Sequence, residues 1–318
     1  MQQFLDFEKP IAELESKIDE LRQMSDPEGA NIAEEISRLK DKADKQLAAL
    51  YARLSAWQKV LVARHEQRPH ALDYISGLIT EYVPLAGDRH FAEDSAIVGG
   101  LGRFEGMSVM IVGIERGSDL QTRLTHNFGM AKPEGYRKHQ RLLDLAGRFG
   151  LPVLAFIDTA GAWPGIDAEE RGQAEAIARS IEATLSVPTP VVATIIGEGG
   201  SGGAIALGAA DQILMLEHAI YSVISPEACA SILWRDPKQA VVAAGALRLT
   251  AQDLLNLKLI DRIVPEPTGG AQRNPQETIK RVGEKISIEL AALTKVEPAI
   301  LRARRREKFL AMSREIIS

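Results

Sequence analysis

The sequence is poor in cysteine, in aromatic residues and in excess positive charge. Its 318 residues include one cysteine, Cys229, which excludes an internal disulfide framework and a Cys₄ or Cys₂His₂ zinc site. Aromatic residues make up 5%, too few to favour a stacking surface for single-stranded nucleic acid. The net charge is −5, from 38 Lys and Arg against 43 Asp and Glu. We therefore expect no nucleic-acid partner, because neutralising phosphates requires a basic face.

Long apolar runs are also missing. No stretch reaches the ~18 apolar residues of a membrane span, and the longest candidate, around Gly202–Leu216, is interrupted by Asp211. Met1 to Glu8 contain no basic segment followed by an apolar core, so we predict no signal peptide. A single cysteine fits a reducing compartment. Together these features favour a cytoplasmic protein that does not associate with membranes.

The N-terminal part, residues 4–65, is charged and has the apolar period of helices. Apolar residues recur three or four positions apart in two sets, which are Ile11, Leu14, Ile18 and Leu21, then Ile32, Ile36, Leu39, Ala43, Leu47, Leu50, Leu54 and Trp57. Between the sets, Ser25–Gly29 contains the Asp-Pro and Gly that favour a turn. The pattern predicts a helical hairpin, either a solvated arm with one packing stripe or a contact between subunits.

Strand and helix patterns alternate from Ile97 onward. Two apolar runs, Ile97–Phe104 and Met107–Ile114, predict a β-hairpin. The other predicted strands are Val153–Ile157, Val191–Ile196, Ile213–Leu216, Tyr221–Ile224 and Ile260–Val264, and the predicted helices are Pro133–Phe149, Ala168–Leu185, Ala204–Ala210, Pro226–Trp234, Lys238–Ala246, Thr250–Leu257 and a tail from Pro275. This alternation predicts an α/β core. The basic run 302–308 in the tail is expected to form a solvated face.

The densest motif, Gly197–Gly203, is compatible with two kinds of site that need particular neighbours. As G-x-G-x-x-G between a strand and a helix, the motif fits a dinucleotide-binding site, and Glu217 supplies the acidic residue expected about 20 positions later. The helix that follows is short, however, which argues against a complete βαβ unit. As G-x-S-x-G it fits the nucleophile elbow of serine hydrolases, with Ser201 as nucleophile. Only Asp211 and then His218 follow in the required order, and so short a stretch does not readily assemble a triad.

A third interpretation of the glycines needs no reactive side chain. Consecutive glycines at a helix N-terminus present backbone amides that lack intrahelical partners, and glycine lets an oxygen approach closely. Such amides form an oxyanion hole; the alternative is a tight packing turn. We expect the nearest carboxylate, Glu198, to accept hydrogen bonds from loop amides rather than act as an acid or base. Cys229 is expected to pack in the interior.

Seven segments of the chain, in order, resemble the carboxyltransferase subunit alpha of acetyl-CoA carboxylase. They are Phe4–Glu15, Leu85–Arg89, Asn127–Met130 with Pro133–Lys138, Phe156–Gly165, Ala168–Arg179, Gly197–Ala204, and Tyr221–Glu227 with Ala230–Trp234. The resemblance covers almost the whole sequence, so it is far more specific than any single glycine motif.

The resemblance implies a crotonase-like spiral of β-β-α units, with an N-terminal helical hairpin and C-terminal helices. It divides the chain into a helical arm, 1–80, and a carboxyltransferase domain with a C-terminal helical extension, 81–318. The implied reaction transfers a carboxyl group from carboxybiotin, carried by the biotin carboxyl carrier protein, to acetyl-CoA, giving malonyl-CoA for fatty acid synthesis. The implied assembly is α₂β₂ with a beta subunit that carries a zinc ribbon, working with biotin carboxylase.

The resemblance also assigns residues. The backbone amides of Gly202 and Gly203 correspond to the family's oxyanion hole, and the substrate-binding positions fall on Gly161, Ala162, Gly199 and Gly200. No metal ligands are implied in this chain, and no cofactor is bound covalently. Two other functions remain open: a crotonase-type acyl-CoA enzyme that works alone, and a non-catalytic scaffold subunit.

The sequence departs from the family pattern in four places. Ala160 replaces a proline, Trp163 a tyrosine and Ala228 a glycine, and 116–126 lacks most of the basic residues that the family carries there. Because proline fixes φ, we expect the backbone at Ala160 to be less constrained.

Overall fold

The computed structural model describes residues 3–23 and 30–312. These residues form the strands β1 (Ile79–Pro84), β2 (Ile97–Phe104), β3 (Met107–Ile114), β4 (Val153–Thr159), β5 (Val191–Gly200), β6 (Gln212–Leu216), β7 (Ile220–Ser222) and β8 (Arg262–Val264). All eight belong to one sheet of order β1-β2-β3-β4-β5-β6-β8, with β7 paired to β5. The first three strands are antiparallel, and every later pair is parallel. The carboxyl ends of β4, β5 and β6 therefore meet at one edge of the sheet.

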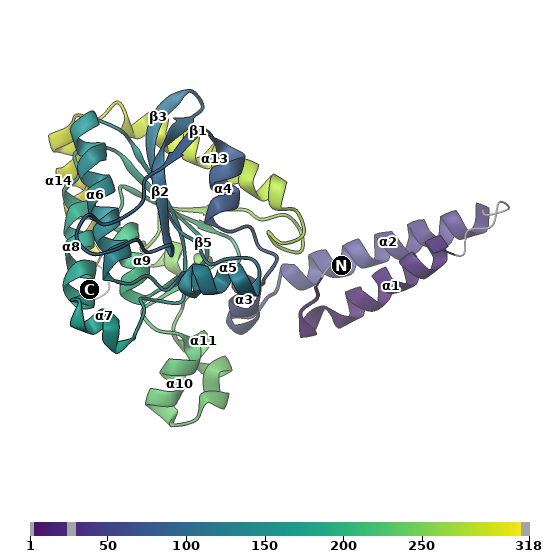
Figure 1. Ribbon diagram of the computed structural model, residues 1–318. Coiled ribbons are helices and arrows are strands. Elements are labelled where there is room, and N and C mark those ends of the chain that lie inside the picture. The colour runs from purple at the N-terminus through teal and green to yellow at the C-terminus, as the bar shows by residue number, and fades with distance from the viewer. Residues whose placement is uncertain (1–2, 24–29, 313–318) are drawn as a thin grey trace.

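Some helices pack on the two sides of this sheet, and others project from it (Figure 1). The longer ones are α1 (Lys9–Gln23), α2 (Ala30–Tyr51), α6 (Pro133–Phe149), α8 (Gln173–Ser186), α13 (Pro275–Leu293) and α14 (Pro298–Ala311), and the shorter ones are α3 (Ala56–Ala63), α4 (Ala71–Leu78), α5 (Leu120–Thr125), α7 (Ile166–Glu170), α9 (Ser201–Gly208), α10 (Pro226–Trp234), α11 (Ala240–Ala246) and α12 (Ala251–Asn256). Figure 1 shows α6, α8 and α14 on one side and α4 and α13 on the other. Every residue of β4 and β5 is buried, as expected of parallel strands covered on both faces.

The predicted β-hairpin is confirmed. β2 and β3 pair in continuous register from Ile97–Ile114 to Phe104–Met107. Their two-residue turn has positive φ at both positions, 48° at Glu105 and 82° at Gly106, which is the geometry that matches the twist of the flanking strands.

The predicted N-terminal helical hairpin is also confirmed, as α1 and α2, which project from the body of the molecule (Figure 1). The predicted turn at 25–29 lies outside the described residues. The base of the hairpin is fixed by polar contacts: Tyr51 Oη donates to Glu8 Oε1 (3.0 Å), and Gln272 Nε2 donates to Tyr51 Oη (3.2 Å). Beyond the hairpin, α3 and α4 lie on the body, and Tyr74 and Ile75 of α4 belong to the main hydrophobic core.

Three details of the sequence prediction were wrong. The strand expected to end at Ile196 continues to Gly200, because β7 pairs with Glu198–Gly200 and supplies backbone partners to the buried glycines; α9 accordingly begins at Ser201 rather than Ala204. The single helix expected over 168–185 is divided into α7 and α8 by Gly172, whose φ is 82°.

The third error concerns the basic run of α14. Arg305 is 1% exposed rather than solvated. Its guanidinium forms a two-pronged ion pair with Asp211 (2.8 and 2.6 Å) and donates to three backbone carbonyls, those of Thr184, Val187 and Thr189. The spacing of the run could not separate this side chain from its exposed neighbours. No helix in the described part of the chain is long and apolar enough to span a bilayer.

Candidate functional site

Two loops meet at the carboxyl edge of the sheet. The β4–α7 loop comprises Ala160–Gly165, and the β5–α9 loop is the sharp turn at Gly200–Gly203. Their backbones touch: a Cβ added to Gly200 would lie 2.2 Å from the carbonyl oxygen of Ala160, and one added to Gly203 would lie 3.1 Å from Gly161 C and 3.2 Å from Ala162 N. The structure thus brings together the two sets of residues that the sequence singled out, although they are about 40 positions apart.

The β4–α7 loop is held by its own side chains. Thr159 Oγ1 accepts from the Gly161 amide (3.0 Å) and donates to the Gly161 carbonyl (2.7 Å). Gly161 has φ of 148°, a conformation that favours glycine, and no atom lies within 4 Å of where its Cβ would be. One face of this glycine is therefore open, next to the start of α9.

The β5–α9 turn places two glycine amides in the first turn of a helix. Ser201 has φ of 53°, so the chain reverses sharply there, and Gly202 and Gly203 follow. The first amides of a helix lack intrahelical partners, and they lie at the positive end of its dipole. A Cβ at Gly202 would lie 3.3 Å from Ile177, and no backbone atom is as close, so this glycine is less enclosed than Gly203. The geometry is suited to binding an oxygen atom that carries negative charge.

The other predicted glycines have strand positions. Gly199 and Gly200 are buried in β5 and pair with Tyr221 and Ser222 of β7. Gly197 lies beside Asp158, whose Oδ1 would be 2.7 Å from an added Cβ. Close packing of neighbouring groups accounts for these glycines, and Gly197 and Gly199 are not part of a phosphate-binding turn.

The serine-hydrolase interpretation does not fit the structure. Ser201 follows the carboxyl end of β5, whereas Asp211 accepts from the amide of Val191, the first residue of β5, and is paired with Arg305. His218 lies against the ring of Tyr51, with ring centroids 5.4 Å apart. Asp211 and His218 thus have other partners, and neither is placed to form a triad with Ser201.

Beneath the two loops lies a buried carboxylate at the end of β4. Asp158 accepts from the amide of Glu198 (3.0 Å) and from Arg116 Nη1 (3.4 Å), and its other oxygen is 3.3 Å from Nδ1 of His70. Burial alone would raise the pKa of Asp158, but the hydrogen bond from His70 and the charge of Arg116 outweigh it and lower the pKa to about 2. The same pairing raises the pKa of His70 despite desolvation. The carboxylate therefore remains charged and paired.

We expected the Glu198 carboxylate to accept hydrogen bonds from loop amides, and this prediction was wrong. Its Oε1 accepts from Arg64 Nη2 (2.6 Å) and its Oε2 from Arg116 Nη1 (3.3 Å), not from loop amides. Because its side chain is 5% exposed, an unpaired carboxylate there would be costly. The basic residues left in 116–126 have internal partners too: Arg123 pairs with Glu66 at 2.8 Å.

Several residues at the site were not found from the sequence. Gln173 Nε2 donates to the carbonyls of Ala131 (2.9 Å) and Trp163 (3.0 Å), and Trp163 Nε1 donates to Asp167 (3.0 Å). Lys132 Nζ pairs with Asp167 and lies 5.6 Å from the Trp163 ring centre. These contacts join α6, α7 and α8 to the loop, and no spacing rule indicates them.

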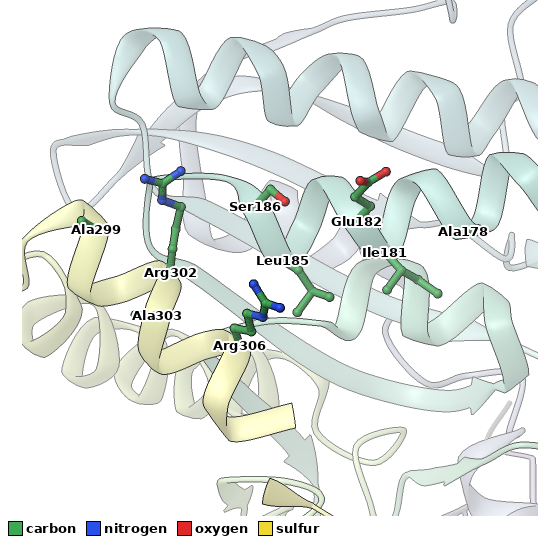
Figure 2. A pocket seen from close by; sticks show the side chains of 9 residues that line it. All are labelled: Ala178, Ile181, Glu182, Leu185, Ser186, Ala299, Arg302, Ala303 and Arg306. Carbon is green, nitrogen blue, oxygen red and sulfur yellow. The ribbon is translucent and has the colours of Figure 1, made fainter. Parts of the chain in front are cut away.

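Cys229 is 7% exposed and packs with Ala230 and Ala243, as expected. Within residues 3–23 and 30–312, no three His, Cys, Asp or Glu side chains are arranged to hold a metal ion. A large groove of about 690 Å³ lies elsewhere, between α8 and α14 (Figure 2). Its lining includes Ile181, Leu185 and Arg306 but no residue of the two loops.

Comparison with known proteins identifies the family. The family model described as acetyl co-enzyme A carboxylase carboxyltransferase-like matches residues 4–313. The acetyl-coenzyme A carboxylase carboxyl transferase subunit alpha of Gluconacetobacter diazotrophicus is 70% identical over 318 residues, which is 100% of both chains. The protein of the same name from Acidiphilium cryptum is 63% identical over 316 residues, 99% of each chain.

Solved structures with similar folds have low sequence identity. A Pseudomonas malonate decarboxylase hetero-tetramer in complex with coenzyme A matches with a TM-score of 0.57 and 16% identity over 70% of this chain and 90% of that chain. Transcarboxylase 12S matches with a TM-score of 0.53 and 17% identity over 67% of this chain and 41% of that chain. These matches bear on the fold alone. The predicted crotonase-like α/β fold is confirmed, and the chain belongs to the acetyl-coenzyme A carboxylase carboxyltransferase-like family.

Proposed function

We propose that this chain is the alpha subunit of an acetyl-CoA carboxylase carboxyltransferase and transfers a carboxyl group from carboxybiotin to acetyl-CoA. The observation that carries the proposal is the pair of touching loops at the carboxyl edge, in a chain that is 70% identical over its full length to a protein of that name. The product is malonyl-CoA, and carboxybiotin is a substrate delivered by the biotin carboxyl carrier protein after biotin carboxylase has formed it.

In this mechanism the chain contributes backbone donors. The amides of Gly202 and Gly203 donate to the ureido oxygen as negative charge builds on it, so the contact strengthens toward the transition state. One such donor is worth roughly 2.7–4 kcal/mol. Carboxybiotin supplies the carboxyl group as CO₂ and a basic nitrogen that accepts the methyl proton of acetyl-CoA. We also assign substrate binding to these two segments: Gly161 and Ala162 form the facing wall, and Gly199 and Gly200 lead from β5 into the turn.

We further propose that a beta subunit, which carries a zinc ribbon, completes the site in an α₂β₂ assembly. Support comes from an exposed apolar surface, the α10–α11 patch, whose six members are 43–71% exposed: Val223, Ile232, Leu233, Trp234, Val241 and Val242. Clustered side chains of this size are typical of an interaction surface. The patch begins at Val223, directly after β7, which pairs with the glycine-rich end of β5. A subunit bound there would lie beside the two loops; Figure 1 shows α10 and α11 projecting from the body.

The division into a helical arm, 1–80, and a carboxyltransferase domain, 81–318, also remains a proposal, as does a cytoplasmic location. The projecting α1–α2 hairpin supports the division. Because α4 packs in the main core, the free part of the arm is the hairpin itself.

The test measures malonyl-CoA formation by the purified chain with and without a beta subunit from the same organism. We expect little or no product from the chain alone and full activity from the complex. Full activity of the chain alone would favour a self-sufficient acyl-CoA enzyme. An inactive but stable complex would favour a scaffold subunit and contradict the proposal.

A further inference from the structure

A line of alternating charges runs from beneath the two loops to the surface. Arg116 Nη1 contacts both Asp158 Oδ1 (3.4 Å) and Glu198 Oε2 (3.3 Å). Arg64 then joins Glu198 Oε1 (2.6 Å) to Glu227 Oε1 (2.7 Å). We call Asp158, Arg116, Glu198, Arg64 and Glu227 the ion-pair chain. It has no break between the end of β4 and helix α10.

The ion-pair chain connects segments that are otherwise distant in the sequence. Arg64 follows α3 and Arg116 follows β3, whereas Asp158 and Glu198 belong to β4 and β5. The two carboxylates lie where the register between β4 and β5 shifts, between the Ile157 and Thr159 pairs. Asp158 also accepts a hydrogen bond from the Glu198 amide. Together these contacts fix the distance between the carboxyl ends of β4 and β5. The touching loops begin at those ends.

The two carboxylates at the inner end of the ion-pair chain, Asp158 and Glu198, are 4% and 5% exposed, and the outermost member, Glu227, is the most exposed, at 40%. The outermost member belongs to α10, which carries part of the α10–α11 patch. A buried ionic network is weak evidence for stability, because apolar side chains of similar volume often stabilise as well. What such a network does supply is a fixed geometry.

We propose that Arg116 and Glu198 are positioning residues: they set the separation of the two loops and connect it to the docking surface on α10. This inference rests on the proposed carboxyltransferase function. Neither residue touches the reacting atoms. They act on Gly202 and Gly203 through the ends of β4 and β5, so their loss reduces kcat rather than substrate affinity.

The experiment compares Arg116→Gln with Arg116→Lys in the assembled α–β complex. Because one nitrogen of Arg116 reaches both carboxylates, a lysine ammonium can replace it. Glutamine removes the cation that links the two carboxylates and leaves Glu198 paired with Arg64 alone and Asp158 with His70 and the Glu198 amide. We expect Arg116→Gln to lower kcat by about 10- to 100-fold, the scale of an ångström-sized misplacement, with KM for acetyl-CoA changed less than about threefold. Arg116→Lys should restore most of kcat.

The matched control is Arg305→Gln, which also removes an arginine from a buried ion pair but at the amino end of β5. We expect it to lower the thermal unfolding temperature and to leave kcat of the folded, assembled complex unchanged. If Arg116→Gln behaves like Arg305→Gln, the ion-pair chain is structural only and the inference is wrong. If Arg116→Gln does not assemble, Glu227→Gln replaces it, because its side chain is partly exposed; an unchanged kcat would then overturn the inference. An inactive wild-type complex would instead refute the proposed function, and with it this inference.

Discussion

Each end of β5 carries a buried cluster of arginine and carboxylate side chains, and the two clusters differ in how far they extend toward the surface. At the amino end, the guanidinium of Arg305 is enclosed by one carboxylate, that of Asp211, and three carbonyls, and both side chains are buried. At the carboxyl end, Arg116 and Arg64 are shared between carboxylates, and the line of charges continues to a half-exposed glutamate on α10. The closed cluster attaches helix α14 to the sheet. The open cluster places the parts of a site relative to one another, so burial of charge serves stability at one end and geometry at the other.

The largest effect is expected from breaking the closed cluster. Asp211→Ala leaves the guanidinium of Arg305 buried without its counter-ion, and removing one partner of such a pair typically costs about 3–5 kcal/mol. Chemical denaturation should show this loss of unfolding free energy. Glu182→Ala provides the matched control, since its pair with Arg179 is more than half exposed and is worth roughly 0–1 kcal/mol. Equal losses in the two variants would contradict the assignment of Arg305 as a structural residue.

The next effect concerns the donors at the open end. Gly202→Pro removes one amide proton in the first turn of α9, where no intrahelical hydrogen bond is lost; we expect kcat to fall by about 10²–10³. Because proline favours extended backbone in the residue before it and Ser201 has φ of 53°, the variant is compared only where it folds and assembles like wild type. Gly202→Ala keeps the donor and adds a methyl group 3.3 Å from Ile177, which a small shift of that side chain relieves, so it should retain activity within a few-fold. Gly203 is less suitable for this test, because its Cβ would lie 2.9 Å from Tyr136 Oη. Steady-state kinetics on both variants, with circular dichroism as the folding control, decide the matter; equal kcat values would mean that the turn only packs.

A smaller effect is expected from acid. The pKa of Asp158 is lowered to about 2 in the folded protein, so its contribution to stability is present above the unfolded pKa of about 3.8 and is lost as pH falls through about 2. The difference corresponds to roughly 2 kcal/mol. Asp158→Asn cannot ionise, so wild type should lose its stability advantage over this variant between about pH 5 and pH 2. Urea unfolding at a series of pH values measures the gap, and a constant gap would argue against a charged, paired Asp158.

The smallest effect is expected at Ser201. The two side chains that follow Ser201 in the order of a nucleophile elbow, Asp211 and His218, are engaged with Arg305 and Tyr51, so Ser201→Ala should keep kcat within a few-fold in the assembled complex. Labelling with a fluorophosphonate provides an independent measurement. Covalent modification of Ser201, or a loss of several thousandfold in kcat, would restore the hydrolase interpretation.

Local patterns in the sequence predicted the features that depend on local residues. The period of apolar residues indicated the α1–α2 hairpin, and the Glu105-Gly106 pair indicated the β2–β3 turn. The glycine motif indicated the β5–α9 turn, because a strand followed by glycines and then a helix has few other geometries. The resemblance to a known family, rather than the motif itself, connected that turn with the β4–α7 loop.

Features that depend on distant partners were not predictable. Nothing in Glu198–Gly200 indicates a strand; those residues are extended because β7, some twenty positions later, supplies the hydrogen bonds. Arg305 is one of several basic residues in its run, and only the position of Asp211 distinguishes it. The partners of Glu198 come from residues 64 and 116, and no spacing along the chain relates them.

The contact between the two loops restricts how this site can change. Gly200 and Gly203 have no room for a Cβ against Ala160–Ala162. The backbones of the two loops are therefore in direct contact, and a larger side chain in one loop displaces the other loop. Gly161 has space but a φ that side chains rarely adopt, and a methyl group at Gly202 requires Ile177 to shift. For protein engineering, stepwise substitution of these two loops therefore has little room to reshape the site, and larger changes have to be made in the surrounding helices.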